Sequence, residues 1–143
     1  MKSRLASHGI DPARVDVHGA VPREQYLAAY AQVDLVLDTF PYPGGTTTCE
    51  ALWMGVPTVT LAGETMIARQ GASLLGAAGL GDWIAASPDA YVAQAAARAG
   101  DLARLASSRA HLREQVHASP LFDAKRFARN LEEALRALAT RGQ

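Results

Sequence analysis

The chain of 143 residues lacks several features that would place it in a special class. Its one cysteine, Cys49, excludes an internal disulfide and any site built from several thiolates. Fourteen basic and fourteen acidic residues cancel, so no net charge attracts nucleic acid or an acidic membrane surface. No stretch approaches the roughly 20 apolar residues of a membrane span, and the N-terminus lacks the apolar segment of a signal peptide. The sequence therefore predicts a cytoplasmic protein with neither a nucleic-acid nor a membrane partner.

The motifs of common metal and cofactor sites are also missing. No lysine follows the glycine pair Gly44–Gly45 as in a Walker A loop, and there is no GxGxxG fingerprint for a dinucleotide. The four histidines are scattered along the chain, and we predict no metal site among them: His8, His18, His111 and His117. We therefore predict no metal and no cofactor, while a nucleotide diphosphate held without these motifs stays possible.

What the chain does have is an alternation of strand-like and helix-like segments. Short apolar or alternating runs at 14–19, 33–40, 58–63 and 83–85 predict strands. The second is expected to be buried and central, and the third is also expected to be buried. Between them, three-to-four spacing of apolar residues predicts helices, and the segment 88–141 is helical throughout. This order predicts an α/β fold with a doubly wound, Rossmann-like parallel sheet and flanking helices. Length and composition favour a single domain over residues 1–143.

One corner between a strand and a helix stands out, the segment PYPGGTTTCE at residues 41–50. Gly44 and Gly45 would let the backbone approach a ligand, and the first N–H groups of a helix starting near Thr46 would have no partner. Together with the hydroxyls of Thr46, Thr47 and Thr48, such a helix start suits a phosphate or diphosphate. The alternative is an ordinary turn in which Thr46 caps the helix. Asp38, at the end of the strand, either faces the ligand or caps the turn.

The corner belongs to a longer stretch, LDTFPYPGGTTTCEALWMGVPTVTLAGE, followed by Arg69 and Ser73 and, near the end, by SPLFDAKRFARNLEEAL. These motifs, in this order, resemble the C-terminal catalytic half of the protein O-linked N-acetylglucosamine transferases. That family consists of inverting GT-B glycosyltransferases linked to tetratricopeptide repeats and includes bacterial members and the plant SPINDLY proteins. The resemblance implies a donor, UDP-N-acetylglucosamine, and a protein acceptor that receives the sugar on serine or threonine.

The resemblance also implies roles for individual residues. Thr46 and Thr47 would contact the donor diphosphate, Glu50 would hold the ribose and Arg23 would lie beside the nucleotide. The backbone near Val21 would contact the uracil edge. Stacking of Tyr26 on the base is our own hypothesis and is not implied by the resemblance. Gly45, Tyr26 and Glu50 depart from the histidines and the aspartate of the animal enzymes, and Gly45 matches the bacterial pattern. No residue is predicted as the catalytic base.

Relative to that family, the chain lacks the tetratricopeptide repeats, the N-terminal half and the first strand and helix of the C-terminal half. Because a GT-B active site lies between two halves, we expect a donor-binding fragment that is inactive alone. The alternative is a non-enzymatic module that binds a nucleotide sugar or a protein and has kept the fold. We further expect Trp53, Met54 and Cys49 to lie in the core, and part of the apolar face of the last helix to be exposed.

Overall fold

The structure, a computed structural model, describes residues 1–141. Its centre is a three-stranded parallel sheet in the order β1-β2-β3, formed by Val36–Leu37, Thr58–Leu61 and Ile84–Ala85. Val36 pairs with Thr58, and Thr60 pairs with Ile84. The helices are α1 (Lys2–Ala6), α2 (Arg23–Ala29), α3 (Thr46–Trp53), α4 (Gln70–Ala77), α5 (Pro88–Gly100), α6 (Leu102–His117) and α7 (Ala124–Arg141). The predicted fold class is confirmed.

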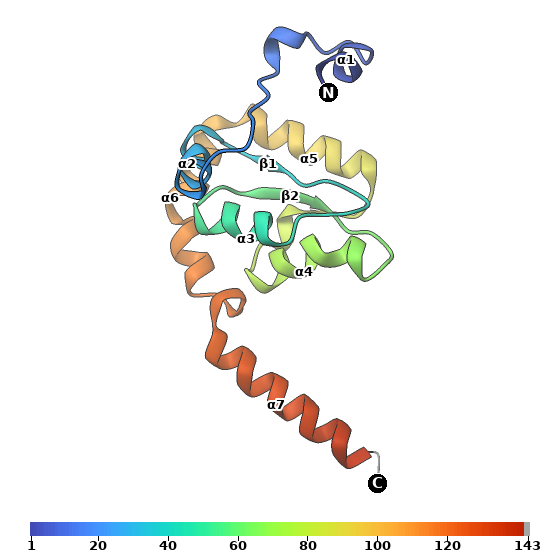
Figure 1. Ribbon diagram of the computed structural model, residues 1–143, viewed down its shortest axis with the longest axis vertical. Coiled ribbons are helices and arrows are strands. Elements are labelled where there is room, and N and C mark those ends of the chain that lie inside the picture. Colours follow the sequence, from blue (N-terminus) through green and yellow to red (C-terminus); the bar gives the residue numbers. More distant parts are fainter. Residues whose placement is uncertain (142–143) are drawn as a thin grey trace.

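Helices cover both faces of the sheet. α5 lies on one side of the strands, and α3 and α4 lie on the other (Figure 1). The buried core includes Leu52 of α3, Val59 of β2 and Leu75 of α4, all without exposed surface, and extends to Leu112 and Val116 of α6. Burial of these side chains, worth about 1.5–3 kcal/mol each, fixes the layers against one another.

Local signals set the ends of these helices. Gly55 at φ +75° and Gly79 at φ +72° follow α3 and α4 in the left-handed conformation that favours glycine. At the other end, the Ser87 hydroxyl accepts from the N–H of Ala90 to cap α5, and Pro88 occupies its first position. Asp101 caps α6 by accepting from the N–H of Arg104 at 3.0 Å.

Two strand predictions were wrong: one of the strands does not form, and the other lies at an edge of the sheet instead of at its centre. Residues 14–19 form no strand: a 3-10 turn at Pro12–Arg14 is followed by irregular chain, and Val17 is 55% exposed. An alternating pattern makes a strand only where a neighbouring strand offers hydrogen bonds, and none of the described strands pairs with this segment. The run 33–40 does contain β1, but as an edge strand with Leu37 56% exposed, while β2 is the buried central strand.

The expected core positions were also only partly correct. The helix predicted between β2 and β3 begins with a 3-10 turn at Ile67–Arg69. Trp53 is 38% exposed and packs against His117 and Phe122 at the surface instead of in the core. Met54 and Cys49 are half-buried. In each case periodicity identified an apolar side chain correctly but assigned it too deep a position.

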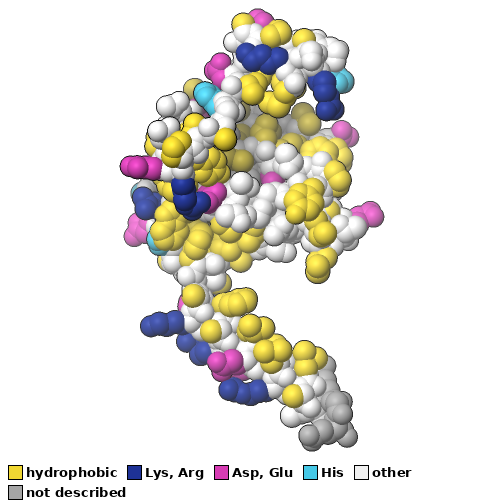
Figure 2. Space-filling view, in the orientation of Figure 1, with side chains coloured by type: hydrophobic (Ala, Val, Ile, Leu, Met, Phe, Trp, Pro, Cys, Tyr) yellow, Lys and Arg dark blue, Asp and Glu magenta, His cyan; other side chains and the backbone are white. Residues whose placement is uncertain are grey.

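The last helix stands away from the rest of the molecule. α7 leaves the body after a short 3-10 turn at Pro120–Phe122 and points outward (Figure 1). Apolar side chains gather along one side of α7, with Lys and Arg along the other (Figure 2). The apolar side includes Phe127, Leu131, Leu135 and Leu138, each about half exposed or more, as expected from the sequence. Within residues 1–141, the helices are all too short or too polar to cross a membrane.

Candidate functional site

The corner after β1 is held in shape by Asp38, which is buried. One carboxylate oxygen, Oδ1, accepts from the N–H of Gly44 at 2.7 Å, and Oδ2 accepts from the hydroxyl of Thr60 in β2 at 2.7 Å. The hydroxyl of Tyr91 in α5 donates to the Asp38 carbonyl at 2.8 Å. Of the two roles considered for Asp38, the structure shows the cap: its carboxylate ties the loop to the sheet.

Glycines allow the loop to pass this close to its neighbours. A Cβ on Gly44 would lie closer than 3.0 Å to the hydroxyls of both Thr47 and Thr48. A Cβ on Gly45 would lie 2.8 Å from Nε2 of Gln70, and one on Gly71 would overlap Asp38 and Thr60. The glycines at 44 and 71 are therefore required by contacts with fixed groups, whereas Gly45 faces the end of a flexible side chain.

The start of α3 presents free hydrogen-bond donors. Gly45 occupies the cap position and offers no side chain, so the alternative in which Thr46 caps the helix is wrong. Within the described chain, the N–H groups of Thr46, Thr47 and Thr48 have no acceptor. Thr46 and Thr47 are exposed, while Thr48 is buried and its hydroxyl donates to the Gly44 carbonyl at 3.0 Å. Thr48 is thus left with its backbone N–H to offer a ligand.

Helix α2 places the next predicted residues beside this helix start. Nη1 of Arg23 lies 2.7 Å from Oε1 of Glu50, and the Arg23 side chain is 71% exposed against 13% for Glu50. An ion pair this open stabilises the fold by at most about 1 kcal/mol, so both groups remain usable by a ligand. The Glu50 carboxylate therefore lies between Arg23 and Tyr26, whose hydroxyl it also contacts.

Tyr26 and Tyr30 lie on the same side of the α3 start as Arg23. The hydroxyls of Tyr26 and Tyr30 lie 2.7 Å apart, and the Tyr30 hydroxyl also reaches the Thr47 carbonyl at 3.4 Å. Burial, then the contacts with Tyr30 and Glu50, raise the pKa of Tyr26 far above its usual value, so its phenol stays protonated. Val21 precedes α2 and is 48% exposed.

Some residues of this corner could not be found from the sequence. Tyr91 reaches Asp38 across 53 positions and Thr60 reaches it across 22, and no short-range pattern marks such pairs. Gln70, at the start of α4, is a third: its carboxamide lies over Gly45 beside the free N–H groups of α3. Among residues 1–141, no cluster of His, Cys, Asp and Glu could hold a metal ion.

This geometry defines a class of protein: a doubly wound α/β domain with an open helix start at the carboxyl end of a strand. Comparison with known proteins adds the family. The family model of glycosyl transferase family 41 matches residues 1–131, and the chain belongs to this family. The resemblance inferred from the sequence motifs is confirmed.

Individual relatives cover nearly the whole chain. SPINDLY of Solanum lycopersicum, a probable UDP-N-acetylglucosamine–peptide N-acetylglucosaminyltransferase, is 42% identical over 137 residues, 95% of this chain and 15% of its own length. A UDP-N-acetylglucosamine–peptide N-acetylglucosaminyltransferase of Caenorhabditis elegans is 32% identical over 94% of this chain and 12% of its own. A mutant O-GlcNAc transferase of Thermobaculum terrenum superposes with a TM-score of 0.87 at 39% identity, over 95% of this chain and 27% of that one. The chain therefore spans about a seventh of the length of the first of these relatives.

Proposed function

We propose that this domain binds the donor of an inverting glycosyltransferase, a UDP-sugar and in the first place UDP-N-acetylglucosamine. The observation that carries the proposal is the open start of α3, where the N–H groups of Thr46 to Thr48 and two exposed threonine hydroxyls converge without a protein acceptor. The names of the relatives support the choice of donor, since they are UDP-N-acetylglucosamine–peptide transferases.

The proposed chemistry uses the diphosphate as a leaving group. A serine or threonine hydroxyl of the acceptor protein would attack the anomeric carbon from the face opposite the diphosphate, the bond from that carbon to the phosphate oxygen would break, and UDP would depart. Negative charge grows on the diphosphate as this bond breaks. N–H groups and hydroxyls already aimed at that position stabilise the growing charge, which is electrostatic catalysis.

The surrounding residues are given roles in holding the nucleotide. The Glu50 carboxylate would accept from a ribose hydroxyl while Arg23 keeps it oriented. Tyr26 and the backbone near Val21 lie on the side where the base would sit. Gly44 and Gly45 would let the diphosphate approach the backbone, and Gln70 would add a side-chain amide donor at the same point.

We further propose that transfer requires a second lobe supplied by the rest of such an enzyme. Thr46, Thr47 and Arg23 are exposed, so water reaches the proposed diphosphate position freely. Glycosyl transfer to a protein hydroxyl needs a closed site that excludes water as the competing acceptor. On this proposal the second lobe and the tetratricopeptide repeats bring the protein acceptor, and residues 1–143 alone are inactive. We also propose a cytoplasmic setting, supported by the lone cysteine.

The test is a titration of the isotopically labelled chain with UDP, UDP-N-acetylglucosamine and GDP, following amide signals. We expect the amides of residues 44–50 and the side-chain amide of Gln70 to shift with the uridine nucleotides and much less with GDP. Replacing both Thr46 and Thr47 by alanine should weaken UDP binding about tenfold, because hydrogen bonds to a charged group are lost.

The matched control is Thr140→Ala, which removes a threonine hydroxyl from α7, far from the corner. Its affinity for UDP should equal that of the original chain. Unchanged affinity of the Thr46/Thr47 variant in a folded sample would contradict the site. Specific UDP binding without transfer by a two-lobed protein would instead favour the non-enzymatic alternative.

A further inference from the structure

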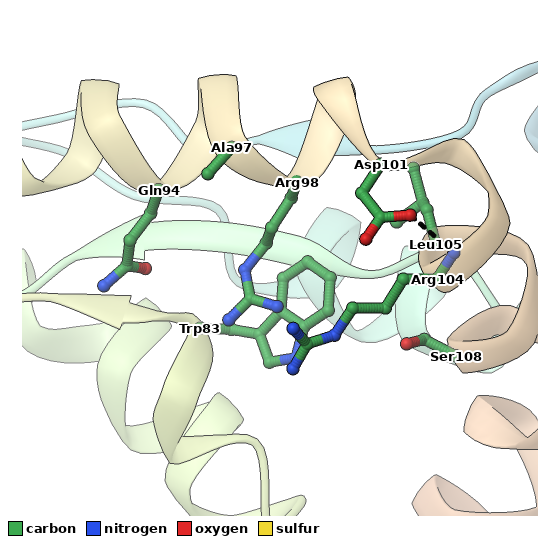
Figure 3. A pocket seen from close by; sticks show the side chains of 8 residues that line it. All are labelled: Trp83, Gln94, Ala97, Arg98, Asp101, Arg104, Leu105 and Ser108. Carbon is green, nitrogen blue, oxygen red and sulfur yellow. Dashed lines mark hydrogen bonds between the residues drawn. The ribbon is translucent and has the colours of Figure 1, made fainter.

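A cavity whose lining combines apolar surface with two arginines lies at the opposite edge of the sheet from the α3 corner. It has a volume of about 220 Å³ and is formed by α5, the first turns of α6 and Trp83 (Figure 3). Trp83 directly precedes β3, so the cavity is at the amino end of a parallel strand, whereas the corner follows the carboxyl end of β1. None of the residues proposed to bind the donor lines it.

Arg98 is held in one orientation at this cavity. Its guanidinium carbon lies 3.6 Å from the centre of the Trp83 ring, and its Nη2 donates to the Asp82 carbonyl at 2.5 Å. Stacking on an aromatic face leaves the in-plane N–H groups of a guanidinium open at its edge. Burial, and then the positive charge of Arg104, lower the pKa of Arg98. The Asp82 carboxylate acts in the opposite direction but does not offset the other two effects, so the net shift of the Arg98 pKa is downward.

Arg104 adds a second guanidinium from the first turn of α6, directed toward Trp83 (Figure 3). Its side chain makes no hydrogen bond or ion pair with the described part of the chain. Asp101 is the acidic residue of the lining, yet its Oδ1 accepts the backbone N–H of Arg104 as the helix cap, and it pairs with neither guanidinium. Two cations thus face one cavity with no carboxylate bound to either.

Further along the cavity, the lining carries groups for a hydrogen-bonding ligand. Oε1 of Gln94 is buried and has no partner within residues 1–141. Ser108 contributes a hydroxyl to the lining near Arg104. An isolated inorganic anion would satisfy the guanidiniums but leave the Gln94 carbonyl without a donor. A ligand that carries both an anionic group and a hydroxyl would satisfy both ends.

We propose that this cavity is a second anion site, which binds the phosphate group of a small, soluble phosphomonoester between Arg98 and Arg104. Guanidinium forks match phosphate oxygens in geometry and charge, and the tryptophan stack removes part of the freedom that Arg98 would otherwise lose on binding. The hydroxyl-bearing part of the ligand lies toward Gln94. The proposal rests on no contact with the donor corner and is independent of the proposed transferase function.

The experiment titrates the labelled chain with inorganic phosphate and, separately, with glycerol 3-phosphate, at constant ionic strength set with sodium chloride. We expect the Trp83 indole N–H and the amides of residues 94–108 to shift, with the ester binding more tightly than phosphate. Replacing Arg104 by glutamine should weaken ester binding about tenfold, since one charge-assisted bidentate contact is lost. Arg104→Lys keeps the positive charge but not the two-pronged guanidinium. Its affinity for the ester should lie between those of the original chain and Arg104→Gln.

Arg129→Gln, on α7, is the matched control, because it makes the same change of charge far from the cavity, and its affinity should not change. Arg104 makes no side-chain bond within the described chain, so its replacement is expected to leave the fold intact, which the amide spectrum checks directly. Equal binding by Arg104→Gln, or equal shifts with chloride alone, would overturn the site. Equal affinity for inorganic phosphate and glycerol 3-phosphate would overturn the assignment of a phosphomonoester as the ligand. Shifts confined to residues 44–50 would place all phosphate at the donor corner and also overturn the proposal.

Discussion

Helices α3 and α7 differ in burial, and the difference is the opposite of what their apolar patterns predict. α7 has the clearer apolar side, with Phe127, Leu131, Leu135 and Leu138, yet every side chain from residue 124 to 140 is exposed. α3 buries Thr48, Ala51 and Leu52, a face with a single large apolar residue. The helix with the weaker pattern is therefore the one that is tied into the body.

The difference shows what fixes an element in place. α3 is anchored by the corner before it, where Asp38 joins Gly44 to the sheet, and by packing against α4 and α6. α7 meets the body mainly at the 3-10 turn that precedes it. Periodicity identifies which side of a helix is apolar but not what covers that side. Changes around the α3 corner should thus cost far more stability than changes along α7.

The largest effect is expected from Asp38→Ala. It leaves the half-buried Gly44 N–H and the buried Thr60 hydroxyl without their acceptor. Two such losses should lower the free energy of unfolding by about 3 kcal/mol. Denaturant unfolding followed by circular dichroism measures this. Asp38→Asn, which keeps the shape and one acceptor, should lose less, and Asp16→Ala on the exposed N-terminal segment should not move the midpoint. A midpoint for Asp38→Ala equal to that of Asp16→Ala would contradict the anchoring role.

How much of this could be predicted depends on sequence distance. The α3 corner was visible because its glycines and threonines are contiguous and lie between a strand and a helix. Its anchors, Thr60 and Tyr91, were not visible, since Tyr91 gave only an apolar position in a helix and its hydrogen bond to Asp38 spans 53 residues. The cavity at Trp83 was missed for the same reason. Its two arginines come from different helices, and the spacing of residues along the sequence does not reveal that Arg98 stacks on Trp83.

For the strands, the sequence pattern predicted more than the structure contains. The alternation at residues 14–19 predicted a strand from side-chain pattern alone, but a strand also needs a partner edge, which the pattern does not supply. β1 was expected to be central because its run is apolar, and it lies at an edge of the described sheet with Leu37 half exposed. Hydrophobicity in a strand therefore predicted burial correctly only for β2, which has neighbours on both sides.

Replacing either glycine of the corner by alanine is expected to have a smaller effect on stability, and the two replacements should differ from each other. An alanine Cβ at Gly44 would meet two hydroxyls whose positions the helix and loop fix, so Gly44→Ala should cost about 1–3 kcal/mol of stability. At Gly45 the Cβ would meet the end of Gln70, which is exposed and can turn away, so Gly45→Ala should cost less than about 1 kcal/mol. Unfolding midpoints rank the two.

The same pair of variants separates stability from binding. If Gly45→Ala keeps the midpoint but weakens UDP binding, the displaced Gln70 amide or the backbone approach is what the ligand uses. Gln70→Ala alone distinguishes these two causes, because it removes the side-chain amide and leaves the approach to the Gly45 backbone open. Weaker UDP binding by this variant would identify the amide as the contact, and unchanged binding would identify the backbone approach. Equal unfolding midpoints for Gly44→Ala and Gly45→Ala would contradict the difference between fixed and flexible neighbours.

The smallest effect is expected on α7. Replacing Leu131 and Leu135 by glutamine keeps good helix formers on a surface that already meets water, so the unfolding midpoint of the body should shift by the equivalent of about 0.5 kcal/mol or less. Sedimentation of the same variant reports on association, because an exposed apolar side of this length favours contact with another apolar surface. A loss of several kcal/mol in dilute, monomeric samples would show that α7 packs on its own body in solution. The contrast between α3 and α7 would then disappear, since both helices would be anchored by burial.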